Sequence, residues 1–194
     1  LEYTYQVAHT AYTKRAFELA DVISDAPCFS DYRQLDQIFP DSKFVYLERD
    51  LDNWLPSIQR LLNKMRLSLE PDTGHFNPVL KRSFNDVFGS PTEDDYLSPQ
   101  HLEACYRAHQ VGVFEYFSAR DDLLTLDISE QGSLTKLLEF LNIKASDERE
   151  FPMLNVGKQV DAWKEFKHPN KVNPNSAGRE HRKFFDYRTL TSFS

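Results

Sequence analysis

Arg49 and Ser57, eight residues apart, are side chains whose types could together hold an anionic group. The range 43–48 before them is short, β-branched and aromatic, which predicts a strand covered on both faces. A helix is predicted to follow, up to about residue 67. The guanidinium offers a charge-assisted fork, the hydroxyl a donor and the helix N-terminus partial positive charge, which together suit a phosphate. The alternative is that Arg49 pairs with a nearby carboxylate and Ser57 is only a polar residue on the helix surface.

The elements that must position these residues follow from apolar periodicity and from Gly and Pro punctuation. With Asp52 as N-cap, Pro56 lies near the end of the first helical turn, where few hydrogen bonds are lost. The remaining predicted elements are helices over 7–20, 30–39, 79–88 and 133–141, a long helix from Ser98, and strands over 21–25 and 123–128. Strands alternating with helices indicate a three-layer α/β/α fold with a central parallel sheet, in which ligands bind at the carboxyl ends of the strands. The residues expected at such ends are Asp25, Arg49, Asp50 and Asp127.

Length and composition indicate one globular domain of 194 residues, which we place over 1–156, with an arm over 157–194 packed on it. A net charge of −7 argues against broad nucleic-acid binding, and neither a membrane span nor a signal peptide is evident. Cys28 and Cys105 lie far apart without a CxxC spacing, so we expect two reduced, mostly buried thiols in a cytoplasmic protein. No metal-ligand spacing occurs.

Several stretches carry a resemblance to a known family. They are Asp25-Ala26-Pro27, Phe39-Pro40-x-x-Lys43-Phe44-Val45, Arg49-Asp50-x-x-x-Trp54-x-x-Ser57, Tyr106-x-x-His109 and Leu123-Leu124-x-Leu126-Asp127. Over about residues 20–156 the chain resembles the sulfotransferases that use 3′-phosphoadenosine 5′-phosphosulfate (PAPS), most closely their short bacterial-type members. The resemblance implies a P-loop-like three-layer fold and no metal.

The resemblance also implies roles for individual residues. Arg49 and Ser57 would bind the 3′-phosphate of PAPS, the group that separates it from common adenine nucleotides. Asp25 stands two residues before Pro27, where many members have a catalytic histidine, and would take the proton of a hydroxyl or amine on a small-molecule or glycan acceptor. The alternative for Asp25 is a turn residue that caps backbone N–H groups.

The sequence departs from the family in its phosphate loop. All six glycines are isolated, so the Gly-rich turn that would grip the 5′-phosphosulfate is not found. We therefore expect a domain incomplete at its N-terminus, inactive or nearly so as it stands, with an exposed sheet edge that favours a homodimer. The alternative is a non-catalytic nucleotide-binding or interaction module; a nucleoside-kinase-like phosphotransferase is disfavoured because no Walker-type lysine is present. Candidates for a further 3′-phosphate contact, with a solvated arm as the alternative, are Lys158, Arg179, Arg182 and Lys183.

Overall fold

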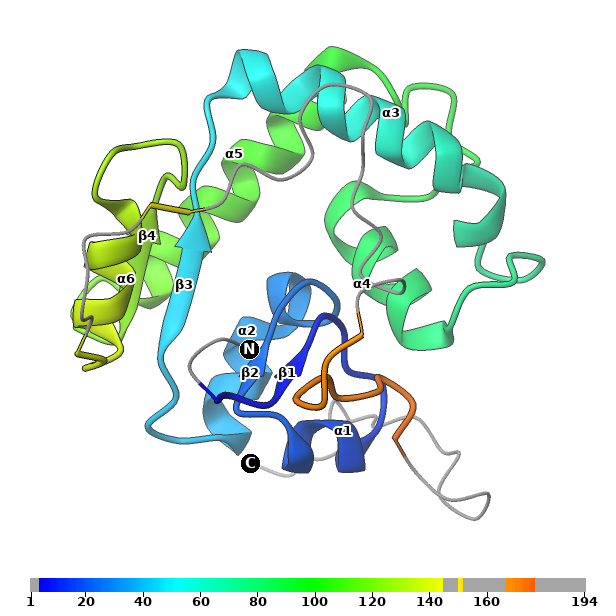
Figure 1. Cartoon of the computed structure of the whole chain (residues 1–194). Coiled ribbons are helices and arrows are strands. Elements are labelled where there is room, and N and C mark those ends of the chain that lie inside the picture. Colours follow the sequence, from blue (N-terminus) through cyan, green and yellow to red (C-terminus); the bar gives the residue numbers. More distant parts are fainter. Residues whose placement is uncertain (1–3, 145–149, 152–166, 177–194) are drawn as a thin grey trace.

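The computed structural model describes residues 4–144, 150–151 and 167–176, and within them short parallel strands alternate with helices (Figure 1). The strands are β1 (Val7–Ala8), β2 (Val22–Ile23), β3 (Phe44–Leu47) and β4 (Leu123–Leu126). The helices are α1 (Lys14–Leu19), α2 (Cys28–Ile38), α3 (Leu51–Leu69), α4 (Pro78–Phe88), α5 (Pro99–Tyr116) and α6 (Ser133–Phe140). The predicted alternation of strands and helices is therefore confirmed from β2 onward.

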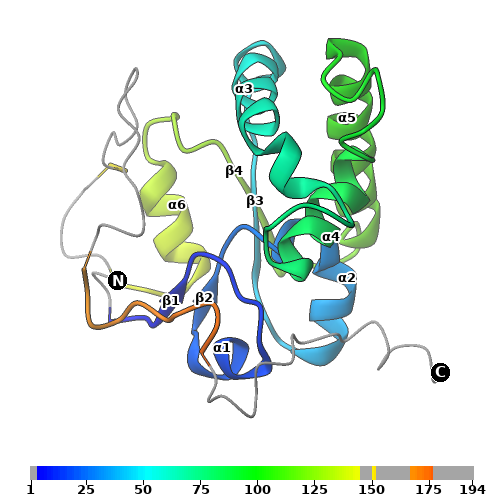
Figure 2. The same ribbon diagram turned by 90° about the vertical axis from the view of Figure 1, so that its right-hand side faces the viewer.

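The strands form two separate parallel pairs. β1 pairs with β2, and β3 pairs with β4 in a register that sets Phe44 opposite Leu123. In Figures 1 and 2, β1 and β2 lie at one end of the molecule, and β3 and β4 lie beside α6 and α5. Parallel pairing is thus confirmed, but within the described residues no ladder joins β2 to β3 into the single central sheet that we expected.

Two predictions, one for a helix over 7–20 and one for the burial of β3, are wrong. The helix predicted over 7–20 begins only at Lys14, where the Thr13 hydroxyl accepts from the Ala16 backbone N–H at 3.1 Å. The residues before it form β1, because their backbone groups pair with β2 and with 170–172, a long-range partner that local periodicity does not reveal. β3 is also not covered on both faces, since the side chains of Val45 and Leu47 are exposed.

The helix after β3 starts two residues earlier than predicted. The Asp50 carboxylate, not that of Asp52, caps α3 by accepting from the Asn53 backbone N–H at 3.1 Å. Pro56 is therefore the sixth helical residue and removes one intrahelical hydrogen bond, contrary to our placement of it in the first turn. The helix continues through Pro56 because its later turns bury apolar side chains, and such packing contributes more to a helix than local propensity.

The main hydrophobic core lies where α3, α4 and α5 pack together. Its fully buried members include Leu62 and Leu69 of α3, Leu102 of α5 and Tyr96 of the connecting loop. A second cluster joins β1, α1 and α2 to Val172. The segment 167–176 thus packs on the domain, while the division at residue 156 stays a prediction, and Lys158, Arg179, Arg182 and Lys183 lie outside the described residues.

Two leucines of α3 provide a matched test of this core. Leu62 is 0% exposed and Leu67 is 78% exposed, although they lie five residues apart on one helix. We expect Leu62→Ala to lower the free energy of unfolding by about 2–5 kcal/mol, because it removes apolar contacts and leaves a cavity. Leu67→Ala should change it by less than about 0.5 kcal/mol. Urea unfolding of both variants checks this, and similar losses in the two would contradict the packing described.

Candidate functional site

Asp25 and Arg49 occupy equivalent positions in the two parallel pairs. Asp25 lies two residues beyond the last residue of β2, and Arg49 lies two residues beyond the last residue of β3. The carboxyl ends of parallel strands are where α/β proteins bind ligands. The structure therefore puts both residues at strand ends, as the sequence predicts, but within its described part no hydrogen bond or ion pair joins them.

The corner from β3 into α3 is fixed through the backbone of Arg49. The Tyr106 hydroxyl, from α5, donates to the Arg49 carbonyl oxygen at 2.8 Å. The Tyr106 ring also packs against Trp54, with ring centroids 4.8 Å apart, so Trp54 is a packing residue. These contacts hold the main chain at residue 49 and leave its exposed side chain outside the packing.

The guanidinium of Arg49 forms no hydrogen bond or ion pair with any residue in the described ranges. The positive charge of Arg49 acts electrostatically on Asp127, which follows β4. The pKa of Asp127 lies below its usual value, mainly because Ser129 donates to the carboxylate through its hydroxyl and its backbone N–H, with a smaller effect of Arg49. The pairing of Arg49 with a nearby carboxylate, the alternative considered above, is thus not seen in these ranges, where the Arg49 side chain is exposed.

Ser57 lies seven residues after the cap residue Asp50, which is about two helical turns, or roughly 10 Å along the axis. Seven residues bring a side chain back to nearly the same face of an α-helix, so Ser57 follows the N-cap on one side of α3. The side chain is half-buried. Arg49 and Ser57 are therefore held by one continuous strand–helix unit.

Asp25 lies in a tight turn between β2 and α2. Its backbone is left-handed, with φ of 60°, and its carbonyl oxygen accepts from the Cys28 N–H at 2.7 Å. About a third of its side chain is accessible (35%), yet burial by the surrounding atoms is the largest influence and raises the pKa of the carboxyl. The positive charge of His9 and the backbone N–H of Ala26 act in the opposite direction. Asp25 therefore is a turn residue, the alternative considered above. Its carboxyl also has a pKa that burial and a neighbouring charge shift in opposite directions.

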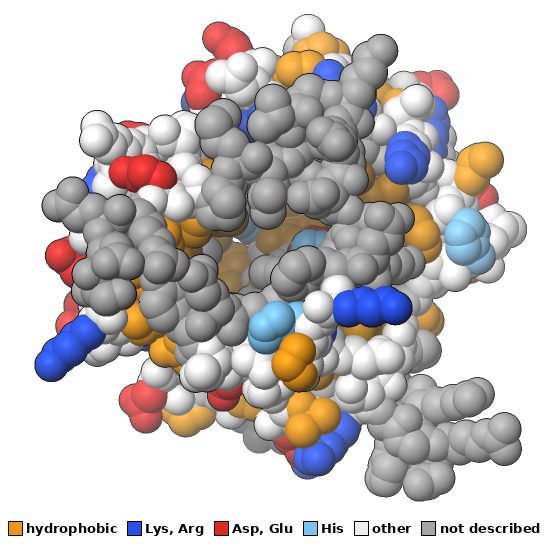
Figure 3. Space-filling model, viewed as in Figure 1, with side chains coloured by type: hydrophobic (Ala, Val, Ile, Leu, Met, Phe, Trp, Pro, Cys, Tyr) orange, Lys and Arg blue, Asp and Glu red, His pale blue; other side chains and the backbone are white. Residues whose placement is uncertain are grey.

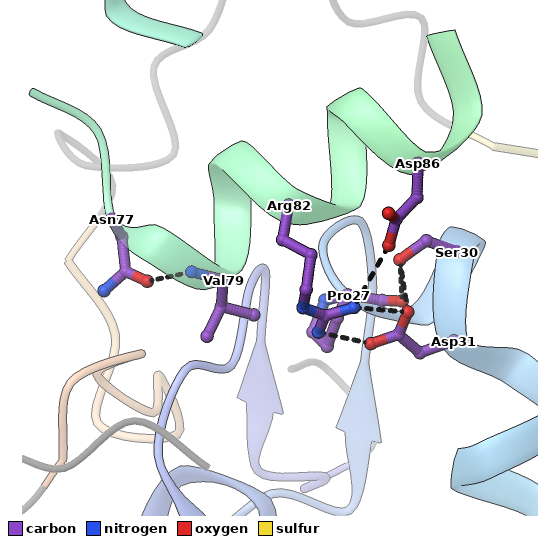
Figure 4. A network of polar contacts seen from close by, with 7 residues as sticks. All are labelled: Pro27, Ser30, Asp31, Asn77, Val79, Arg82 and Asp86. Carbon is purple, nitrogen blue, oxygen red and sulfur yellow. Dashed lines mark hydrogen bonds and ion pairs between the residues drawn. The ribbon is translucent and has the colours of Figure 1, made fainter. Parts of the chain in front are cut away.

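A buried ion pair anchors this turn to the helices (Figure 4). Arg82 of α4 points at Asp31 of α2 and donates to both carboxylate oxygens, at 2.9 Å and 2.5 Å. Asp31 is 0% exposed and also accepts from the Ser30 hydroxyl at 2.8 Å, while its backbone N–H donates to the Pro27 carbonyl oxygen. The pair therefore ties α4 to the start of α2, immediately after Asp25.

The other residues noted in the sequence lie in packed or partly buried positions. His109 of α5 is a packed residue, with Nε2 2.7 Å from the Phe29 carbonyl oxygen. Cys28 and Cys105 are both free and half-buried, and burial raises the pKa of the Cys28 thiol to about 12. Sequence reasoning missed His9, Asp31 and Arg82, because no local spacing indicates their partners.

Figure 3 shows acidic, basic and apolar side chains interspersed over one face of the molecule. In the described part of the chain, no three metal-ligating side chains gather into a cluster. None of the helices that the structure describes has the length and apolar character needed to cross a bilayer.

Comparison with known proteins assigns the family. A family model described as a sulfotransferase domain matches residues 2–160, which include every strand and helix described above. No curated protein matches the chain. The matched range is most of the 194 residues and contains Asp25, Arg49 and Ser57. The chain therefore belongs to the sulfotransferase family.

Proposed function

We propose that this protein transfers a sulfuryl group from PAPS to a hydroxyl or amine of a small-molecule or glycan acceptor. The observation that carries the proposal is an exposed arginine at a strand end, followed by a capped helix that bears Ser57, in a chain of the sulfotransferase family. We further propose that the two parallel pairs belong to one sheet of a three-layer, P-loop-like fold.

Arg49 and Ser57 fit the 3′-phosphate of the donor. A phosphate beside α3 would receive the guanidinium fork from Arg49 and a hydroxyl hydrogen bond from Ser57, both stronger to an anion than to a neutral group. The N-terminal end of α3 adds partial positive charge on the same side. The Tyr106 hydrogen bond fixes the main chain at Arg49, so the exposed side chain starts from a defined position at the N-terminal end of α3.

Asp25 is the proposed general base. In the transfer, the acceptor oxygen or nitrogen bonds to sulfur while the bond from sulfur to the 5′-phosphate oxygen breaks, which releases 3′-phosphoadenosine 5′-phosphate (PAP). The acceptor proton passes to the Asp25 carboxylate and then to solvent. A base is most effective when its pKa lies near the working pH, and burial moves the pKa of Asp25 in that direction.

Selective binding of PAP tests the proposed function. At a PAP concentration a hundredfold above its Kd, binding should stabilise the protein by about 2.7 kcal/mol, which corresponds to roughly 5–11 °C in Tm. AMP lacks the 3′-phosphate and should give a much smaller shift at the same concentration. Thermal unfolding with each nucleotide measures this, and equal shifts with AMP and PAP would argue against recognition of the 3′-phosphate.

The second candidate is a non-catalytic nucleotide-binding or interaction module. It is favoured by the glycines, since Gly74, Gly89, Gly112 and Gly132 stand singly and none opens a phosphate-binding turn in the described residues. Transfer of labelled sulfate from PAPS to a panel of acceptors separates the two candidates. PAP binding without transfer would support the module, and turnover would support the enzyme.

A further inference from the structure

A histidine that the sequence did not single out contacts Asp25. His9 follows β1 by one residue, and the parallel register sets Ala8 of β1 opposite Ile23 of β2. The carboxyl ends of two neighbouring strands therefore bring the side chains together, with His9 Nε2 3.5 Å from Asp25 Oδ2. The other ring nitrogen, Nδ1, lies 3.2 Å from the Ser24 hydroxyl oxygen.

The hydrogen bonds around the ring define where its proton lies. The Ser24 hydroxyl donates to the His9 carbonyl oxygen at 3.2 Å, so its oxygen is left to accept from Nδ1–H. In neutral His9 the Nε2 lone pair then faces a carboxylate oxygen of Asp25. The Nε2 lone pair of His9 and a lone pair of the Asp25 carboxylate repel each other unless a proton lies between them. The geometry therefore favours one proton shared between His9 and Asp25.

We propose that His9 is a positioning residue for Asp25, which orients the carboxyl and helps to keep it ionised so that it can accept the acceptor's proton. This inference rests on the proposed role of Asp25 as general base. The contact joins two strand ends, so the backbone pairing of β1 with β2 holds the imidazole beside the carboxyl.

Other charged and titratable groups lie around the contact between His9 and Asp25. Further titratable side chains come from the elements packed around β1 and β2: Tyr12, Cys28, Asp31, Arg82, His168 and Lys171. Asp31 is already paired with Arg82, and the segment that carries His168 and Lys171 runs along the outer side of β1. Burial raises the pKa of Asp25, and the positive charge of His9 lowers it. Loss of His9 should therefore raise the pKa of Asp25, because the positive charge that opposes the effect of burial is removed.

The test follows the Asp25 carboxyl carbon by NMR as pH is varied, in the wild-type protein and in three variants. In His9→Gln the Asp25 titration midpoint should rise, because the positive charge that lowers the pKa of Asp25 is lost. His9→Lys keeps a cation and should return the midpoint toward the wild-type value, which a purely structural role would not do. His75→Gln replaces an exposed histidine beside Ser68 and should leave the midpoint unchanged.

The outcomes distinguish this inference from the proposed function. An Asp25 midpoint unchanged in His9→Gln, or equally raised in His9→Lys, would overturn the positioning role without reference to activity. In a sulfuryl-transfer assay, the acid limb of the pH–rate profile should move to higher pH in His9→Gln, because a base with a raised pKa loses its proton later. Full activity of Asp25→Asn would instead overturn the proposed base, whatever the NMR titration shows.

Discussion

Replacement of Arg49 by alanine is expected to weaken PAP binding by about 2–4 kcal/mol, or roughly 30- to 1,000-fold in Kd. The substitution removes the guanidinium that the proposal places on the 3′-phosphate and leaves that charge without its closest partner. It should leave the fold intact, because the contact that holds the corner from β3 into α3 uses the Arg49 carbonyl oxygen, which alanine retains. Isothermal titration calorimetry with PAP measures the loss.

Three variants sharpen this prediction. Arg49→Lys should be intermediate, since an ammonium keeps the charge but not the two-pronged geometry. Ser57→Ala removes one hydroxyl donor to a charged group and should cost about 1.5–3 kcal/mol. Arg107→Ala is the matched control, because Arg107 is an exposed arginine on α5 that pairs with Glu103. If Arg49→Ala bound PAP as tightly as Arg107→Ala, the phosphate site would have to lie elsewhere.

Replacement of Arg82 by alanine is expected to lower the free energy of unfolding by about 3–5 kcal/mol. The Asp31 carboxylate, 0% exposed, would lose both hydrogen bonds from the guanidinium and the opposite charge beside it, while the Ser30 hydroxyl still donates to it. The Arg82 side chain is itself only 24% exposed, so water replaces it poorly. Urea unfolding near neutral pH gives the value.

Two comparisons isolate the cause of that loss. Arg107→Ala breaks an exposed ion pair and should change stability by less than about 0.5 kcal/mol. The double variant Arg82→Ala with Asp31→Asn removes the buried charge as well and should recover part of the loss. A change below about 1 kcal/mol in Arg82→Ala would mean that the ion pair does not hold α4 against α2.

The buried ion pair also bears on the proposed site. Because the Asp31 N–H donates to the Pro27 carbonyl oxygen, the pair fixes the first turn of α2 directly after Asp25. The orientation of the proposed base thus depends on a residue of α4, more than fifty positions along the chain, and this dependence is visible only in the tertiary structure (Figure 4).

Local sequence signals determined several of the strands and helices of this protein. The apolar run before Arg49, Ser98-Pro99 before α5 and the spacing from Arg49 to Ser57 predicted a strand, a helix start and a strand–helix unit that the structure contains. These signals succeed because caps, proline and apolar periodicity act within a few residues. The same signals placed Asp25 at the end of a strand, where it lies.

Only the tertiary structure decided the features that depend on distant partners. Residues 7–8 form a strand because 22–23 and 170–172 pair with them, and His9 becomes relevant only because that pairing sets it beside Asp25. Asp31 is buried as an ion because Arg82 reaches it from another helix. Hydrogen bonds between strands and charges buried between helices join residues far apart in sequence, so no local pattern encodes them.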